Sequence, residues 1–96
     1  MSKKNTVSFE FSVSGREDGT LEAAYIRILN EDVATTKEIE EDMLLADYTS
    51  DGRLVGIEIL APTKLSELVK LIKQRDLKLP FRNFVEKSAS REFVIA

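Results

Sequence analysis

The sequence predicts an α+β fold, an antiparallel β-meander of about five strands with a C-terminal helix packed on one face. Three observations carry this prediction: an early alternation of apolar and polar residues, an Asp-Gly pair between two apolar runs, and a later helical stripe of aliphatic residues. At 96 residues, we expect a single domain over 1–96. We divide it into a core over 7–76 and a basic C-terminal extension over 77–96, which is a candidate interface.

The first half of the chain reads as strands. Apolar and polar side chains alternate without a break over 7–13, which is typical of a half-buried strand. A turn over 14–20 contains two glycines, and the apolar run 25–29 is expected to pair back on the first strand. A weaker strand over 33–39 carries several charges, which favours an edge or exposed position.

The strongest local signal is a hairpin over 43–60. Asp51-Gly52 predicts a two-residue type I′ turn, in which both central residues take positive φ. That turn sets the register and places Tyr48 opposite Val55. One face of the hairpin then becomes almost wholly apolar, consisting of Leu44, Ala46, Tyr48, Val55, Ile57 and Ile59.

A change of period after the hairpin indicates a helix. Aliphatic residues spaced by three and four predict a helix over 65–75, with its stripe formed by Leu65, Leu68, Val69 and Ile72. So short a helix needs the sheet to hold its shape. Further on, Pro80 is expected to start a short helix that brings together Phe81, Phe84 and Val85. The run 92–95 is expected to form a final strand.

The second face of the hairpin carries more apolar residues than a solvated sheet face should. Each large side chain left in water forgoes roughly 1.5–3 kcal/mol. We therefore expect either the segment 77–95 or a second copy of the chain to cover this face, and we favour a homodimer. The expected interface residues are Met43, Leu45, Leu54 and Leu60.

Charge is unevenly distributed along the chain. Residues 1–61 hold six basic and thirteen acidic residues, a balance of −7, and residues 62–96 hold eight and four, a balance of +4, which sum to the net −3. One interpretation is a surface for nucleic acid or a toxin partner, formed by Lys70, Lys73, Lys78 and Arg82. Alternatively, these cations offset a helix dipole or attract the acidic half of the same or another chain. The pI near 5.0 and the few aromatics argue against nucleic acid.

Few residues are candidates for chemistry. The sequence has no Cys and no His, which removes thiolate nucleophiles, Ser-His triads and the usual zinc sites. Asp47 and Glu58 fall on the second face at an expected Cα separation of about 7–8 Å, with Arg27 nearby. Two carboxylates can act as general acid and base, but an ion-pair cluster is favoured because no cleft or nucleophile accompanies them. We expect no enzymatic activity, no cofactor and no metal site.

The location of the protein is expected to be cytoplasmic. No apolar run approaches the ~18 residues that a membrane-spanning helix requires. The N-terminal residues 1–4 lead into polar sequence and not into the apolar stretch of a signal peptide.

Two stretches resemble a known family. They are Leu-Glu-Ala-Ala-Tyr-Ile-Arg-Ile over 21–28, and Asp-Tyr-Thr-Ser-Asp-Gly-Arg-Leu-Val-Gly-Ile-Glu-Ile-Leu over 47–60. The chain is similar, from about Phe9 to Ile72, to a widespread prokaryotic family of small proteins catalogued as domain of unknown function 2283. It departs from the family at Ala24, where a bulkier apolar residue is usual, and in its longer tail after Ile72.

The resemblance implies a small α+β fold and no established activity. Some such small proteins are suspected antitoxin-like partners of compact toxins. We therefore expect a non-enzymatic protein-interaction module that acts as a homodimer. The alternative is an antitoxin-like or nucleic-acid-binding partner protein that uses the basic C-terminal segment.

Overall fold

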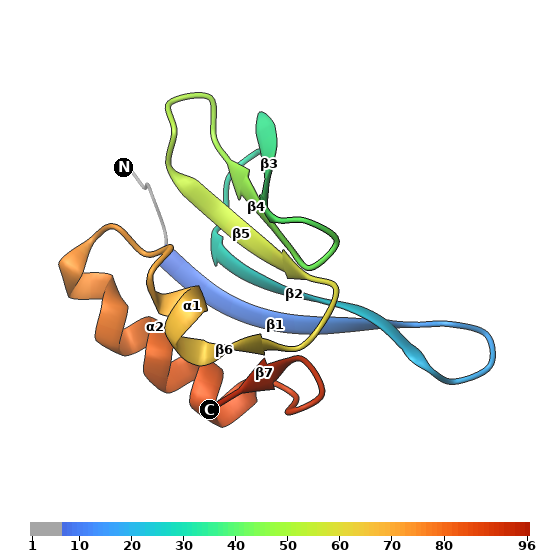
Figure 1. Cartoon of the computed structure of the whole chain (residues 1–96). Coiled ribbons are helices and arrows are strands. Elements are labelled where there is room, and N and C mark those ends of the chain that lie inside the picture. Colours follow the sequence, from blue (N-terminus) through green and yellow to red (C-terminus); the bar gives the residue numbers. More distant parts are fainter. Residues whose placement is uncertain (1–6) are drawn as a thin grey trace.

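The N-terminal part of the fold is a long hairpin. In the computed structural model, which describes residues 7–96, β1 (Val7–Gly15) and β2 (Leu21–Leu29) pair antiparallel, with Phe11 opposite Ile26. Gly19 takes φ 91° in the connecting turn, a conformation that glycine adopts without strain. The predicted pairing of these two strands is confirmed. Figure 1 shows the hairpin projecting well beyond the helices.

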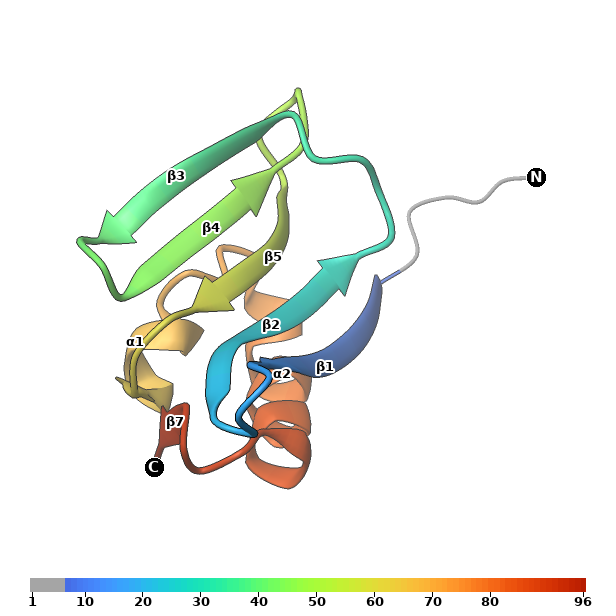
Figure 2. The same ribbon diagram turned by 90° about the vertical axis from the view of Figure 1, so that its right-hand side faces the viewer.

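Three further strands complete the sheet. They are β3 (Thr35–Glu40), β4 (Leu44–Tyr48) and β5 (Leu54–Ile59), and the order across the sheet is β1-β2-β5-β4-β3. The predicted five-stranded antiparallel sheet is confirmed. A simple meander would place β3 beside β2. In this sheet the chain passes after β2 to the far edge, where β3 begins, and β5 is the strand that pairs with β2 (Figure 2). This is a Greek-key arrangement.

Side-chain and backbone bonds hold that crossover against the β4–β5 loop. Two nitrogens of the Arg53 guanidinium donate to the two carboxylate oxygens of Glu31, at 2.6 and 2.8 Å. The Ala34 N–H donates to the carbonyl of Tyr48 at 2.8 Å. A bidentate pair of this kind fixes orientation as well as distance.

The hairpin turn differs from the prediction. The register from Leu44 opposite Ile59 to Asp47 opposite Gly56 is as predicted, but Tyr48 pairs with Leu54 instead of Val55. The loop holds three residues, because the Thr49 N–H donates to the Arg53 carbonyl.

Polar bonds inside the loop explain its extra residue. Gly52 takes φ 88°, whereas Asp51 does not take the positive φ that a type I′ turn demands. The Thr49 hydroxyl donates to the carboxylate of Asp51 and accepts from the Arg53 N–H, so it supports the longer loop. A β-bulge at Val55 follows, and it turns Leu54 toward the helices.

The helices divide the predicted segment 65–75. Helix α1 covers only Leu65–Val69, after which the Leu71 and Ile72 N–H groups bond three residues back, at 3.1 and 3.0 Å, and the helix ends. The prediction of one helix to residue 75 is therefore wrong. Most of its apolar stripe is nevertheless buried. Leu65, Leu68 and Ile72 are at most 4% exposed, although Ile72 lies in the connection, and Val69 is half-buried.

Helix α2 covers Arg75–Ser88 and contains Pro80, which was expected to begin a helix. Pro80 lies on the exposed side, where its missing N–H leaves one backbone bond unmade. The prediction that Phe81, Phe84 and Val85 lie together is confirmed, since Phe81 and Val85 belong to one core cluster and Phe84 packs against it. Strand β7 (Val94–Ile95) pairs in parallel with β6 (Thr63–Lys64), so the expected final strand is present but short.

The core lies between the sheet and α1 and α2. It includes Ile26 and Ile57 from the sheet, Leu68 from α1, and Phe81, Val85, Phe93 and Val94 from the C-terminal segment. The segment 77–96 is thus part of the core and covers the chain's own sheet, where an extension was expected. Within residues 7–96, no helix is long and apolar enough to cross a lipid bilayer.

Candidate functional site

The sheet face that points away from the helices, the outer face, carries a polar cluster. Cross-strand pairing aligns Arg27, Gly56 and Asp47 on three neighbouring strands, and it aligns Tyr25 with Glu58. Alternation along the strands puts the side chains of these residues on the other face of the sheet from the buried Ile26 and Ile57. The side chains of Tyr25, Arg27, Asp47 and Glu58 are half-buried.

Tyr25 and Asp47 form the centre of this cluster. The Tyr25 hydroxyl donates to Oδ2 of Asp47 at 2.9 Å, and the Thr36 hydroxyl donates to Oδ1 at 2.6 Å. The phenol lies over the backbone of Gly56, so close that a Cβ there would be 2.1 Å from the phenol oxygen. The pKa of Tyr25 is raised above its ordinary value of 10.0, mainly by burial of the phenol and to a smaller extent by its hydrogen bond to Asp47.

The structure brings the predicted polar residues Arg27, Asp47 and Glu58 to one face but does not join them as an ion-pair cluster. The Arg27 guanidinium donates to the Leu29 carbonyl at 3.4 Å, and hydroxyls satisfy Asp47 instead. The sequence analysis did not identify Thr36 as a partner of Asp47. It also missed the Tyr25 ring over Gly56, although a glycine in a strand of bulky residues is a signal that another group lies close to the backbone. Among residues 7–96, no three Asp or Glu side chains gather closely enough to hold a metal ion.

The raised pKa of Tyr25 predicts a loss of stability at high pH. Below pH 10 the phenol is protonated in both the folded and the unfolded chain, so it adds no pH dependence. Above pH 10 the unfolded chain ionises first, and the free energy of unfolding falls as the pH rises toward the folded pKa. Urea unfolding of the wild type and Tyr25→Phe between pH 8 and 11.5 measures this difference. A fall of equal size in both proteins would contradict the prediction.

The four residues predicted as an interface do not form one patch. Leu45 is half-buried on the outer face, and Leu60 is 38% exposed just beyond β5. Met43 and Leu54 pack against the core cluster, Leu54 because the bulge at Val55 turns it toward the helices. The rest of the outer face around Leu45 is mostly polar, so the expected apolar second face is absent from the described residues; its polar members include Thr36, Glu38, Asp47 and Glu58.

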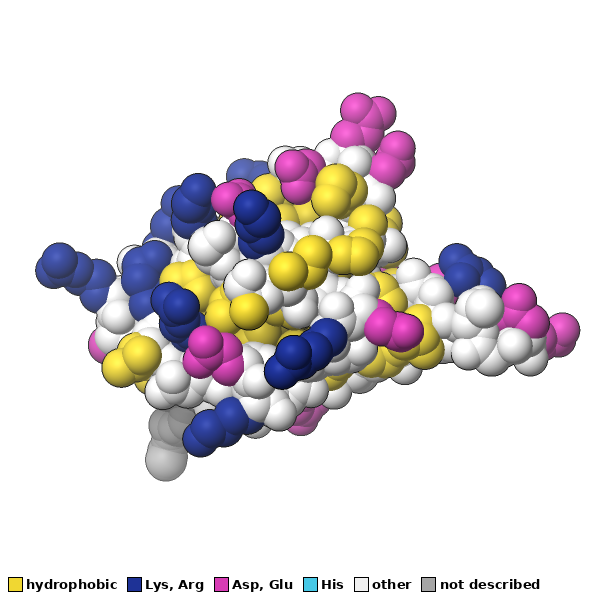
Figure 3. All heavy atoms as spheres, turned by 60° about the horizontal axis from the view of Figure 1, so that its bottom comes forward, with side chains coloured by type: hydrophobic (Ala, Val, Ile, Leu, Met, Phe, Trp, Pro, Cys, Tyr) yellow, Lys and Arg dark blue, Asp and Glu magenta, His cyan; other side chains and the backbone are white. Residues whose placement is uncertain are grey.

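The predicted basic residues lie on the helical side of the molecule. Figure 3 shows most of the Lys and Arg side chains toward the left of the molecule and most of the Asp and Glu side chains toward its top and right. Lys70 pairs with Glu67 at 3.2 Å and Arg82 with Glu86 at 3.7 Å, so their charges are offset. Lys78 donates to the Val69 carbonyl at 3.3 Å and keeps an uncompensated charge, and Lys73 borders a cavity.

This cavity, the loop–helix groove, lies between the β4–β5 loop and the connection from α1 to α2. Its volume is about 150 Å³, comparable to apolar cavities that accept one benzene-sized group. Aliphatic side chains form most of its lining, and the exposed Lys73 and Gln74 also border it; the lining comprises Ile28, Leu29, Tyr48, Gly52, Arg53, Leu54, Leu71, Ile72, Lys73, Gln74 and Leu77. Sequence reasoning missed the groove because three distant segments build it.

Basic side chains without an ion-pair partner among the described residues stand on the helical side of the groove. Arg53 contributes little, because Glu31 and Asp51 flank its guanidinium at 2.6 and 3.1 Å. Within residues 7–96, no carboxylate lies within 4.0 Å of the cationic groups of Lys73, Arg75 or Lys78. Bonds from Thr49 and Arg53 lower the pKa of Asp51, which keeps this loop carboxylate ionised and paired.

Comparison with known proteins adds one match. No curated protein and no solved structure matches the chain significantly. One family model matches residues 18–61, which run from the β1–β2 turn to the end of β5 and include Tyr25, Asp47 and Gly56. The match is narrower than the expected Phe9 to Ile72 and leaves out both helices. Over these residues the chain resembles the family described as Protein of unknown function (DUF2283).

Proposed function

We propose that this protein is a non-enzymatic protein-interaction module whose binding site is the loop–helix groove. The observation that carries the proposal is an apolar cavity open to solvent beside uncompensated cations. Such a combination suits a partner segment that presents one apolar side chain among carboxylates, because the cavity desolvates the apolar group while the cations attract the flanking acids.

The walls of the groove support a preformed site. Arg53, Asp51 and Glu31 are joined by ion pairs, so the loop on one side of the groove is fixed to the crossover. On the other side, Ile72 is buried in the core and anchors the connection that carries Lys73. A site that needs little ordering on binding retains more of its contact energy as affinity.

The test uses two short fluorescein-labelled peptides, Glu-Glu-Leu-Glu-Glu and Glu-Glu-Ser-Glu-Glu, titrated by fluorescence polarisation. We expect the Leu peptide to bind, the Ser peptide to bind roughly tenfold more weakly, and Lys73→Glu to weaken binding of the Leu peptide by a similar factor. Arg91→Glu, an equal charge change outside the groove, is the matched control and should bind like the wild type.

A labelled duplex DNA in the same assay tests the alternative function. Binding of the duplex that Lys73→Glu abolishes, without binding of either peptide, would favour nucleic-acid recognition and contradict the proposal. The salt dependence of affinity further separates nucleic-acid binding from peptide binding. As the salt concentration rises, contacts to many phosphates lose affinity much more steeply than contacts to one short acidic peptide.

A further inference from the structure

The end of β3 and the turn that follows it, residues 38–42, are called the acidic tip, and they carry the apolar side chain among carboxylates that the proposed function requires of a partner. Ile39 is 41% exposed at a β-bulge in β3, where the register shifts between Glu38 and Glu40. Glu38, Glu40, Glu41 and Asp42 surround it, and all are exposed. No ion pair within residues 7–96 offsets these four carboxylates.

The acidic tip has a defined shape. Asp42 takes φ 61°, in the left-handed region that reverses the chain within a few residues. The Met43 N–H donates to the Glu40 carbonyl at 3.0 Å, and the Asp42 N–H donates to the carboxylate of Glu38 at 3.2 Å. These bonds hold the apolar side chain and its flanking carboxylates in one compact turn.

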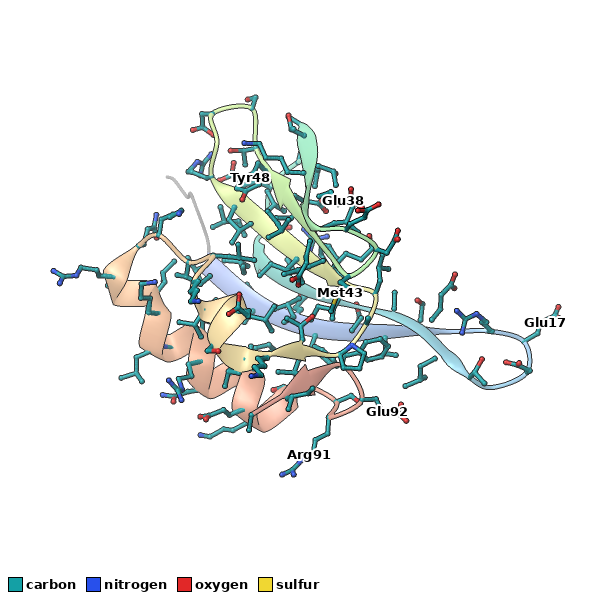
Figure 4. The ribbon with its side chains drawn as sticks, in the orientation of Figure 1. Glu17, Glu38, Met43, Tyr48, Arg91 and Glu92 are labelled. Carbon is teal, nitrogen blue, oxygen red and sulfur yellow. The ribbon has the colours of Figure 1, made fainter. Side chains whose placement is uncertain are left out.

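The tip cannot reach the groove of its own chain. The groove borders the loop after β4, and the tip precedes β4, so the strand separates them by its whole length. Five residues of strand span roughly 17 Å. Figure 4 shows Glu38 on the side of the sheet away from α1 and α2.

We infer that the acidic tip of one copy of this chain docks in the loop–helix groove of a second copy, with Ile39 entering the cavity and the flanking carboxylates facing Lys73 and Arg75. This inference rests on the proposed function and names the partner. Two copies arranged antiparallel make the contact twice, once at each end of β4, which closes the assembly as a dimer. The paired contacts reinforce each other because the second forms within one complex.

Sedimentation velocity from micromolar to millimolar concentration tests the inference. The wild type is expected to shift reversibly from one chain to two. Glu41→Lys, Lys73→Glu and Ile39→Ser should each weaken the dimer roughly tenfold or more. All three positions are on the surface, so circular dichroism should show an unchanged fold.

Mixing two variants makes the test specific. Glu41→Lys has an intact groove and Lys73→Glu an intact tip, and in the mixture each reversed charge meets the other reversed charge. An equimolar mixture should therefore recover most of the dimer that each variant alone has lost. General repulsion between acidic chains predicts otherwise, because Glu41→Lys lowers the net negative charge and would then strengthen association.

Matched controls lie elsewhere on the surface. Glu17→Lys on the projecting hairpin and Arg91→Glu before β7 repeat the charge changes away from the tip and groove, as Figure 4 shows, and Val13→Ser repeats the loss of an exposed aliphatic group. These controls should dimerise like the wild type. A wild type that stays monomeric, or a dimer that tip and groove variants leave intact, would overturn the inference. If the protein does not dimerise in this way but still binds the Leu peptide, the inference fails and the proposed function stands. If it neither dimerises nor binds the Leu peptide, the proposed function fails as well.

Discussion

Gly56→Ala is expected to lower the free energy of unfolding by roughly 2–4 kcal/mol, although it adds a single methyl group. The new Cβ would lie 2.1, 2.4 and 2.7 Å from three atoms of the Tyr25 phenol, so the whole ring has to leave its place. The ring then loses its contact with the sheet and its hydrogen bond to Asp47. Gly56 has no positive φ, so backbone strain adds nothing to this effect.

A double-mutant cycle isolates that cause. In a Tyr25→Ala background the clash is gone, and Gly56→Ala should cost less than about 1 kcal/mol, with the difference appearing as coupling between the two sites. Gly15→Ala is the matched control, because its Cβ would make an ordinary 3.6 Å contact with the Thr20 carbonyl oxygen. Urea denaturation measures each value. An equal cost of Gly56→Ala in both backgrounds would show that Tyr25 is not the reason for this glycine.

Phe81→Ala is expected to cost about 3–5 kcal/mol, the usual range for removing a buried aromatic ring. Phe81 is fully buried, and its ring meets Phe9 of β1 edge-on with centroids 5.8 Å apart. Removing it opens a cavity where α2 joins the sheet. Because a domain of this size is marginally stable, the variant should unfold at a much lower urea concentration.

Leu79→Ala serves as the control for this change, since Leu79 lies on the same helix but is 65% exposed. Its effect should stay within about 0.5 kcal/mol. If Phe81→Ala cost no more than Leu79→Ala, α2 would not be packed on the sheet, and the segment 77–96 would be the extension that the sequence suggested.

The strands were predictable because a period of two leaves a direct trace in the residue pattern. Their order was not, because alternation says where a strand lies but not which strand lies beside it. The crossover is stabilised by Glu31 and Arg53, which are 22 residues apart in the chain. Nothing in the local pattern marks those two residues as partners.

The bulge at Val55 explains why one of the four residues expected on the outer face, Leu54, does not lie there. A strict alternation through the hairpin puts Leu54 on the outer face, and the bulge at Val55 moves it to the inner one. The extra loop residue depends on the bonds of the Thr49 hydroxyl, which compete with the familiar Asp-Gly turn. The groove then follows from the same shift, since Leu54 becomes part of its lining.

The crossover also has a kinetic meaning. The strands within residues 7–29 and within residues 35–59 can each pair with their neighbours in sequence. The pairing between β2 and β5, in contrast, joins Ala24 to Ile59 and Arg27 to Gly56 across a long stretch of chain. Closing that stretch costs entropy before any contact rewards it, which slows this step relative to hairpin formation. Until β2 and β5 pair, a newly made molecule presents the unpaired edges of both strands. We expect this to be the stage at which it is most prone to aggregation.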